Sequence, residues 1–480
     1  MAKIESELLE KMRNGEKLTT RQQLTMIATL SLPAILAQLS SVLMEYIDAA
    51  MVGQLGAEPS ASIGLVAPLT WVFFGVTSAS VTGFAVQIAQ NIGAKNEKNA
   101  RNILKNAAFF TFLLSIILGT VGVAISSFVP GWLRGEIAIQ HDAYLYFLTF
   151  MAALPIFLGV MFISAMLRCS GNIKTPSAIH VLICILDIFF NFLLIFDSHH
   201  IPISSNFAIT IPGAGLGVFG AALGTVCAEI CGFCLLLRTL FKPSCLLKPI
   251  RSEKFQWDKP AALKAAKISL PIAFEHCVMS GALVMITRII APLGAVSLSA
   301  NSLAVSAESI CYMPCYGISE AATTIIGQSI GAKRHDLTRR LALMAVFMGI
   351  GVMVFMGAFM FAAAPLMFAL LTPVAATQAL GIKILRIEAF AEPFYGAAIV
   401  STGCLRGAGD TFVPSLMNFA SMWGVRISLS LLLVDSLGLV GVWIAMASEL
   451  AFRGCIFFIR IFRKDWSKSV IGKREATQEE

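Results

Sequence analysis

Polar side chains that could bind a cation or a proton stand within long apolar segments of this 480-residue sequence. Glu45 and Asp48 are three residues apart, and Asp187 and Asn191 are four apart, so each pair shares one face if its segment is helical. Together with the Thr225 hydroxyl, these groups offer the oxygen ligands that a hard cation such as Na⁺ prefers. They equally suit a proton site, because a carboxylate removed from water takes up a proton more readily.

The composition of the chain places these acids inside a membrane. Hydrophobic residues make up 57% of the sequence and charged residues 13%, about half of their usual share in soluble proteins. A spanning helix needs about 20 apolar residues, so twelve spans would use roughly 240 of the 480 residues. The sequence therefore predicts an all-α membrane protein with short loops and no large soluble domain.

Apolar runs separated by polar residues, glycine and proline predict twelve transmembrane helices. These helices lie near residues 25–52, 60–90, 104–128, 140–166, 175–196, 214–240, 264–291, 297–329, 338–366, 374–404, 412–435 and 438–462. The first six form an N-lobe over 25–240, and the last six form a C-lobe over 264–462. Residues 1–24 are predicted to be a leader, 241–263 a linker and 463–480 a tail.

Lysine and arginine set the predicted orientation. Of the 36 basic residues, all but five lie in the N-terminal segment, in every second loop or in the C-terminal segment; the exceptions are Arg134, Arg288, Lys383, Arg386 and Arg426. The positive-inside rule then makes both termini and the linker cytoplasmic, as in a multi-pass protein of the bacterial inner membrane. Because the net charge of +8 is spread over these loops, nucleic acid is not an expected partner.

The two halves of the chain are copies of one another. Six landmarks recur at a constant offset of 238 residues: Pro33 and Pro271, Leu55-Gly56-Ala57 and Leu293-Gly294-Ala295, the segments that begin at Gln90 and Gln328, Leu167-Arg168 and Leu405-Arg406, Gly171 and Gly409, and Pro176 and Pro414. One ungapped register over six helices indicates an internal repeat. Because six spans are an even number, both lobes have the same orientation, and transporters built this way bind between their repeats.

Acids that are present in only one copy are the stronger functional candidates, because the shared residues belong to the scaffold. Asp48 corresponds to Ile286 and Asp187 to Val425 in the other copy. A carboxylate in a membrane span costs a few kcal/mol or more and marks a functional site by default. The alternative is an acid that is paired with an arginine in a span or that caps a helix, and Arg426 is the expected partner for one such acid.

A second group of residues forms the predicted substrate surface. Glu45 in the first lobe and Glu275 and Glu392 in the second are unmatched acids, and Met279 and Phe394 are apolar residues that could line a cavity. Most methionine and phenylalanine residues in such a chain simply pack against neighbours or lipid. No cofactor is expected besides the coupling ion, and Asp48, Asp187 and Asn191 would be metal ligands only for sodium.

The sequence resembles the multidrug and toxic compound extrusion (MATE) family along essentially its whole length. The likeness rests on residues 46–56, which begin Tyr46-Ile47-Asp48, on the Gln-x-x-Gly-Ala-Lys segments at Gln90 and Gln328, and on 405–411, Leu405-Arg406-Gly407-Ala408-Gly409-Asp410-Thr411. The resemblance implies two six-helix lobes arranged as a V, and export of amphiphilic, often cationic, organic compounds coupled to a cation. It also implies that Asp48 is the coupling acid of the first lobe.

Other positions depart from the family pattern. Some members carry an asparagine and then an aspartate four residues later on the fifth helix, whereas this sequence has Asp187 before Asn191. In another branch, acids on the seventh and tenth helices serve the second lobe, and Glu275 and Glu392 each lie about one turn before those positions. The coupling ion therefore stays open between H⁺ and Na⁺.

These observations predict a cation-coupled antiporter that works by alternating access, with small organic molecules and membrane lipids as partners and a monomer as the functional unit. A flippase for lipid-linked precursors of related two-lobed architecture is the alternative, but it would need a strongly basic central cavity. An enzyme is not expected, because the sequence has neither an HExxH nor a GxSxG motif. A channel is also compatible with the composition, but a two-lobed parallel repeat with acids in one copy only is more typical of a transporter that works by alternating access.

Overall fold

A computed structural model describes residues 2–133, 135–204, 207–243, 245–250, 252–463 and 466. The first half contains α1 (Ala2–Arg13), α2 (Thr20–Gly53), α3 (Ala57–Gly93), α4 (Glu97–Ile125), α5 (Val129–Trp132), α6 (Ile137–Ala152), α7 (Leu154–Cys169), α8 (Lys174–Ile195), β1 (Asp197–Ser204), β2 (Phe207–Ala214) and α9 (Gly217–Leu240). The predicted position of Arg134 and most of the predicted tail, 463–480, lie outside the described residues.

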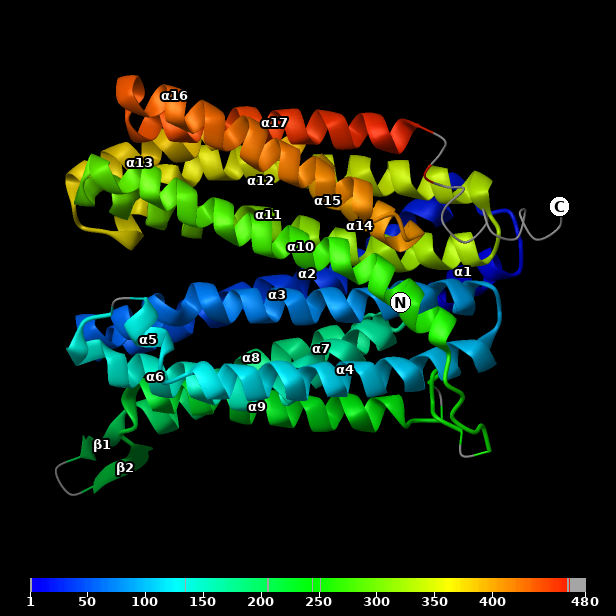
Figure 1. The fold of residues 1–480 in the computed structure, drawn as a ribbon, viewed down its shortest axis with the longest axis horizontal. Coiled ribbons are helices and arrows are strands. Elements are labelled where there is room, and N and C mark those ends of the chain that lie inside the picture. The colour runs from blue at the N-terminus through cyan, green and yellow to red at the C-terminus, as the bar shows by residue number, and fades with distance from the viewer. Residues whose placement is uncertain are drawn as a thin grey trace.

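The second half repeats this series of helices. It contains α10 (Lys259–Ile290), a 3₁₀ turn (Ala291–Leu293), α11 (Ala295–Gly331), α12 (His335–Leu371), α13 (Ala375–Glu388), α14 (Glu392–Ala408), α15 (Phe412–Phe419), a π-helical segment (Ala420–Ile427), α16 (Ser428–Leu437) and α17 (Leu439–Phe462). The two halves lie as two layers of nearly parallel helices (Figure 1). The first helix of each lobe packs against the second helix of the other, α2 on α11 and α10 on α3, and these four helices form the junction between the lobes.

All twelve predicted spans are helical in the described residues. In the part of the chain that the structure describes, nine helices are long and apolar enough to cross a membrane, and α6 and α7, bent by 48°, would together make a tenth. The other two predicted spans correspond to α11 and to the pair α13 and α14. Both are more polar, since α11 is rich in serine and the α13–α14 pair carries charged residues. The two-lobed, twelve-helix arrangement is therefore the one predicted from sequence.

The repeat offset is kept by the helix boundaries themselves. The starts of α3 and α11, Ala57 and Ala295, lie 238 residues apart, and so do those of α4 and α12, α6 and α13, α7 and α14, and α8 and α15. Lys95 and Lys333, also 238 apart, share a left-handed backbone with φ of 58° and 55°. The equivalence thus extends to an unfavourable conformation that non-glycine residues rarely adopt.

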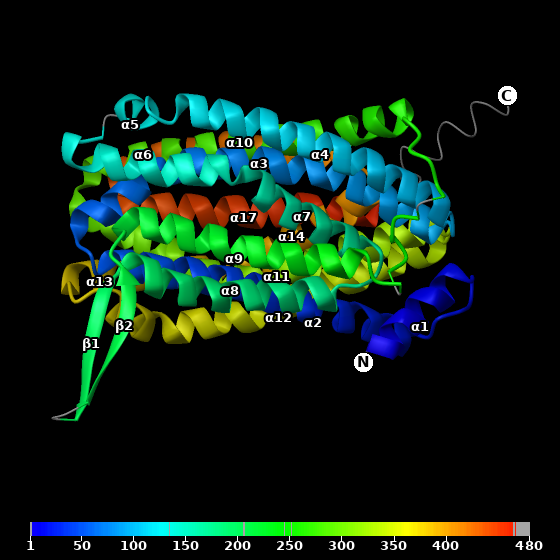
Figure 2. The ribbon, with the colours of Figure 1, turned by 90° about the horizontal axis from the view of Figure 1, so that it is seen from below.

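A β-hairpin breaks this register before the last helix. Strands β1 and β2 pair in antiparallel fashion between α8 and α9, and the hairpin extends away from the helix bundle (Figure 2). The second half turns at Gly438 instead, so the starts of α9 and α17 are 222 residues apart rather than 238. The sequence analysis did not predict this hairpin. Its end of the bundle is called the hairpin end below, and the opposite end, which holds α1 and the linker, is called the basic end.

The lobes meet most closely at the basic end, where the last turns of α3 and α11 cross. A Cβ atom on Gly93 would lie 2.0 Å from the carbonyl oxygen of Gln328, and one on Gly331 would lie 1.9 Å from that of Gln90. Gln90 Nε2 donates to the carbonyl of Gly407 at 3.3 Å, and Gln328 Nε2 donates to the carbonyl of Cys169 at 2.7 Å. The backbones of α3 and α11 are therefore in direct contact, and each lobe donates a hydrogen bond to the other.

Helix α1 joins this contact, although the sequence analysis treated 1–24 only as a leader. Leu8, Leu9 and Met12 are buried in a hydrophobic cluster that belongs mainly to the second lobe. Arg13 donates from Nε and Nη2 to Gln328 Oε1 at 3.2 and 3.0 Å, and from Nη2 to the carbonyl of Ser170 at 3.4 Å. The N-terminal helix thus bridges the two lobes at the basic end.

We expect Gly331→Ala to weaken this closure, because the added methyl group must push α3 away from α11. Overpacking of this kind costs about 1–3 kcal/mol. The purified variant should melt several degrees below the wild type, and a cysteine placed near the crossing should react faster with a thiol reagent. Gly351→Ala in α12 is the matched control, because nothing lies within 4 Å of a Cβ there. Equal melting temperatures for both variants would contradict a tight crossing.

Candidate functional site

Three helices of the first lobe bring the predicted ion-coupling residues together. Asp48 lies near the hairpin end of α2, Asp187 and Asn191 lie on α8, and Thr225 lies on α9. Helix α8 packs between α2 and α9. Residues 181–195 of α8 are apolar apart from Asp187 and Asn191, and these two side chains turn inward and are fully buried.

The Asn191 amide joins the two carboxyl groups. Its Nδ2 donates to Asp48 Oδ1 at 2.7 Å and to Asp187 Oδ2 at 3.0 Å. This confirms the predicted shared face of Asp187 and Asn191. The carboxyl groups of Asp48 and Asp187 also lie within hydrogen-bonding reach of each other. Two adjacent carboxylates resist carrying two negative charges at once, so the pair is suited to hold a proton or a cation.

Oxygen atoms at this site are left with capacity for a ligand. Asp187 Oδ1 and Asn191 Oδ1 are buried and accept no hydrogen bond from the described residues. Thr225 lies beside Asp187, and its hydroxyl donates to the carbonyl of Ala221 at 3.1 Å, which leaves the oxygen free to accept. Within the described part of the chain, no group of three or more His, Cys, Asp or Glu residues could hold a metal. Any sodium site here therefore depends on the amide and hydroxyl oxygens as well.

A glycine on α9 fixes the position of the Asn191 amide. A Cβ on Gly224 would lie 2.0 Å from Asn191 Oδ1, and one on Gly220 would lie 2.3 Å from the carbonyl oxygen of Leu194. Small residues let membrane helices approach closely in this way. The tight seam between α8 and α9 therefore holds the amide against the two carboxyl groups.

Two further residues lie beside the carboxyl pair. Glu45, one turn before Asp48 on α2, is exposed and close enough for the two charges to repel each other. Tyr146 of α6 also lies within electrostatic reach of Glu45, Asp48 and Asp187. The sequence analysis missed Tyr146. Comparison of the repeats could have found it, because the equivalent position in the second lobe is Ile384.

Glu275 in the second lobe is fully engaged with its neighbours. Its Oε1 accepts from Arg406 at 3.3 Å and from Asn418 at 2.7 Å, and its Oε2 accepts from Ser415 at 2.7 Å. These partners lie on α14 and α15. Glu275 therefore ties the first helix of the second lobe to two others, which is the pairing alternative considered for the unmatched acids.

Glu392 has a different environment. It is fully buried, and both of its carboxyl oxygens lack a partner among the described residues, as do those of Glu388 one turn earlier in the chain. Glu308 and Arg426 lie within electrostatic reach of Glu388. Arg426 thus sits among second-lobe acids as expected, although its terminal nitrogens contact the sulfur atoms of two methionines. The sequence analysis did not foresee that these three acids lie together.

Met279 and Phe394, the apolar residues of the predicted substrate surface, do not lie at one place. Met279 on α10 packs against a hydrophobic cluster drawn mainly from α10, α11, α12, α13 and α17, whereas Phe394 on α14 is 42% exposed. The structure therefore brings Asp48, Asp187, Asn191 and Thr225 together as one site. It disperses the predicted substrate residues over both lobes.

Two six-helix lobes related by a parallel repeat, with buried acids in the spans, define a membrane transporter of the two-lobed type. A comparison with known families agrees: the profile of the MatE family matches residues 33–193 and 271–432, one segment in each lobe. The matched segments cover more than half of the chain. This chain belongs to the MATE family of transporters, and it is a transporter rather than an enzyme.

Individual relatives match over nearly their whole length. The chain is 28% identical over 466 residues to the probable multidrug resistance protein NorM of Thermotoga maritima, with 94% of each chain covered. The fold resembles that of the Vibrio cholerae MATE transporter VcmN in its bent form, with a TM-score of 0.82, 17% identity, and 93% and 97% of the two chains covered. A MOP superfamily transporter from Pyrococcus furiosus matches with a TM-score of 0.83, 18% identity, and 95% and 100% coverage.

Gly224→Ala tests whether the position of the Asn191 amide matters. The added methyl group would displace the amide from the two carboxyl groups, and loss of this bridge should lower ion-driven transport about tenfold, the equivalent of one hydrogen bond to a charged group. Transport by reconstituted protein gives the measurement. Gly64→Ala, on α3 of the same lobe with nothing within 4 Å of its Cβ, is the control. Wild-type transport by Gly224→Ala would show that the bridge is dispensable.

The two second-lobe acids should respond differently to neutralisation. Glu275→Gln weakens the ion pair with Arg406, so we expect a loss of about 1–3 kcal/mol in stability. Glu392→Gln removes no partner among the described residues and relieves the cost of a buried charge, so this variant should be at least as stable as the wild type. Thermal melts of the purified variants compare the two. A fall for Glu392→Gln as large as that for Glu275→Gln would contradict the distinction.

Proposed function

We propose that this transporter exports amphiphilic, often cationic, organic compounds from the cytoplasm in exchange for an inward-moving proton or sodium ion. The observation that carries the proposal is the carboxyl pair of Asp48 and Asp187, which is bridged by Asn191 within the membrane-spanning part of one lobe only. The name of the Thermotoga maritima relative, a probable multidrug resistance protein, supports the substrate class. The proposed setting is the bacterial inner membrane, with both termini cytoplasmic and a single chain as the functional unit.

Coupling in this proposal comes from the effect of ion occupancy on the orientation of the lobes. An ion held by Asp48, Asp187 and Asn191 neutralises the carboxyl pair and favours one orientation of the lobes, whereas the ion-free site favours the substrate-competent orientation. A membrane potential supplies about 2.3 kcal/mol per charge per 100 mV. One ion can therefore sustain a useful substrate gradient.

Either coupling ion fits the proposed site. A proton would neutralise one carboxyl and let it donate a hydrogen bond to the other. A sodium ion would draw on the free oxygens of Asp187, Asn191 and Thr225, which are the ligand types it prefers. Transport measured under a proton gradient and under a sodium gradient, applied separately, distinguishes the two ions.

A flippase for anionic lipid-linked precursors has less support. Such a protein needs basic side chains between its lobes, free to bind the anion. Arg168 on α7 lies 3.5 Å from Glu320 on α11, and Gln38 donates to the same carboxylate at 3.1 Å. The repeat equivalent of Arg168 is Arg406, which is paired with Glu275. Both arginines are therefore engaged by acids.

Asp48→Asn should reduce gradient-driven transport to the leak rate while the protein still folds and inserts, because a neutral amide neither takes up a proton nor balances the charge of a sodium ion. Proteoliposomes loaded with a fluorescent organic cation would be given a pH gradient and a sodium gradient in separate experiments. Asp435→Asn, an exposed carboxylate on α16, is the control. Undiminished transport by Asp48→Asn would remove this residue from the mechanism, and failure of the wild type under both gradients would refute the antiporter.

A further inference from the structure

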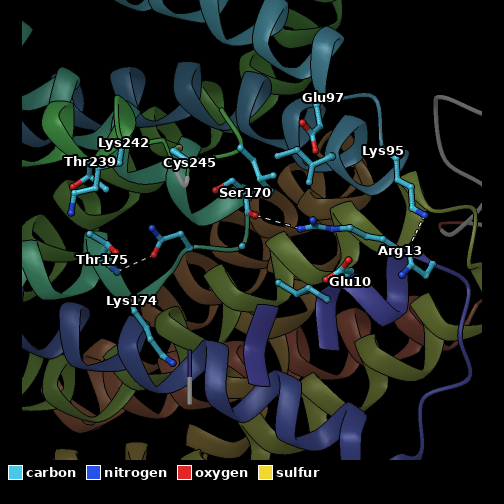
Figure 3. Close-up of a pocket in the computed structure, with 16 residues that line it drawn as sticks. Glu10, Arg13, Lys95, Glu97, Ser170, Lys174, Thr175, Thr239, Lys242 and Cys245 are labelled. Carbon is cyan, nitrogen blue, oxygen red and sulfur yellow. Dashed lines mark hydrogen bonds between the residues drawn. The ribbon is translucent and has the colours of Figure 1, made fainter. Parts of the chain in front are cut away.

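A cavity of about 790 Å³ lies at the basic end, far from the carboxyl pair. It opens to the solvent and is lined by α1, the turn between α3 and α4, the turn between α7 and α8, and the chain that follows α9 (Figure 3). Asp48 is separated from this end by 28 residues of α2, about 40 Å of helix. The cavity is therefore distinct from the ion site.

Cationic side chains from four separate elements line this cavity. They are Arg13 on α1, Lys95 after α3, Lys174 at the start of α8 and Lys242 after α9. The acids on the same wall are Glu10 and Glu97, and Glu97 already lies 3.3 Å from Arg101 outside the cavity. Positive charge is therefore in excess, which favours an anionic ligand.

The charge of Arg13 in particular has no anionic acceptor in the described part of the chain. Its hydrogen bonds go to neutral oxygens, those of the Gln328 side chain and the Ser170 backbone. Burial is the main cause that lowers the pKa of this guanidinium. Lys95 likewise donates to a neutral group, Asn14 Oδ1, at 2.7 Å. Glu97 and Glu10 lie within electrostatic reach of Arg13 but accept no hydrogen bond from it, so an anion in the cavity would give these two cations a charged acceptor in place of neutral ones.

The rest of the wall fits an anion with an apolar part. The first turn of α8, a helix of 22 residues, lines the cavity at Thr175, and the positive end of a helix dipole favours negative charge. The Thr175 hydroxyl adds a hydrogen-bond donor, whereas the hydroxyls of Ser170 and Thr239 already donate to backbone carbonyl groups and can only accept. Leu9, Ile92 and Leu246 provide an apolar side.

We propose that this cavity binds a phosphate ester with one or two negative charges and an adjoining apolar group. The two sources of that chemistry are the headgroup of an anionic phospholipid and a soluble phosphate ester. The ligand would link α1 to the first lobe, and α1 already packs into the second lobe and donates to Gln328 there. Occupancy would therefore stabilise the closed contact between the lobes at the basic end.

Binding of short-chain probes to the full-length, delipidated protein in neutral detergent tests the proposal without relying on transport. Dioctanoyl phosphatidylglycerol is the anionic lipid, dioctanoyl phosphatidylcholine the zwitterionic control, and glycerol-1-phosphate the soluble arm. We expect saturable binding at one site of an anionic probe, absent for phosphatidylcholine, together with a rise in melting temperature. Tighter binding of phosphatidylglycerol than of glycerol-1-phosphate would identify the ligand as a lipid headgroup. Equal binding of the two probes would identify it as a soluble ester.

The repeat supplies a matched pair of variants for this test. Lys95→Gln removes a cation from the cavity wall, whereas Lys333→Gln removes its equivalent, with the same left-handed backbone, from the other lobe and outside the cavity. We expect Lys95→Gln to weaken binding roughly fivefold or more and Lys333→Gln to leave it unchanged. Arg13→Gln should weaken it further. Equal affinities for Lys95→Gln and Lys333→Gln, or equal binding of the zwitterionic and anionic lipids, would overturn the proposal.

Discussion

The crossing of α3 and α11 is the contact on which the arrangement of the two lobes depends. Gly93 and Gly331 let the helices approach until backbone meets backbone, and Gln90 and Gln328 then reach carbonyl groups of the opposite lobe. These four positions are related by the repeat, so one short sequence serves both sides of the contact. A transporter that rocks its lobes must break this contact in part of its cycle, and its energy is therefore part of the barrier between orientations.

The two lobes contribute equivalent residues to this crossing, but they differ in the charged residues of their membrane spans. In the first lobe, a buried amide holds Asp48 and Asp187 together. In the second, Glu275 is neutralised by Arg406, while Glu392 and its neighbours are buried without a partner in the described residues. Since burying a charge costs several kcal/mol, each arrangement must be balanced by a partner, an ion or a proton. The repeated scaffold tolerates this asymmetry because it is held by other residues.

Much of the fold could be predicted from sequence, because apolar length and a constant repeat offset are local, additive signals. The contact between Asp187 and Asn191 was predictable for the same reason, since four residues make one turn. The partners of Glu275 were not, because they lie 131–143 residues away and depend on helix packing. Helix α1 and the hairpin were missed because each is too short to give a clear periodic signal.

The hairpin of β1 and β2 has a consequence for imaging. A two-lobed bundle with a pseudo-twofold axis along the membrane normal presents two nearly equivalent views in electron micrographs, and the surrounding detergent hides most of the side-chain differences. The hairpin belongs to one repeat alone and projects from the bundle (Figure 2), so it marks which lobe is which. An antibody fragment raised against it would serve as a fiducial for particle alignment without touching either the ion site or the basic end.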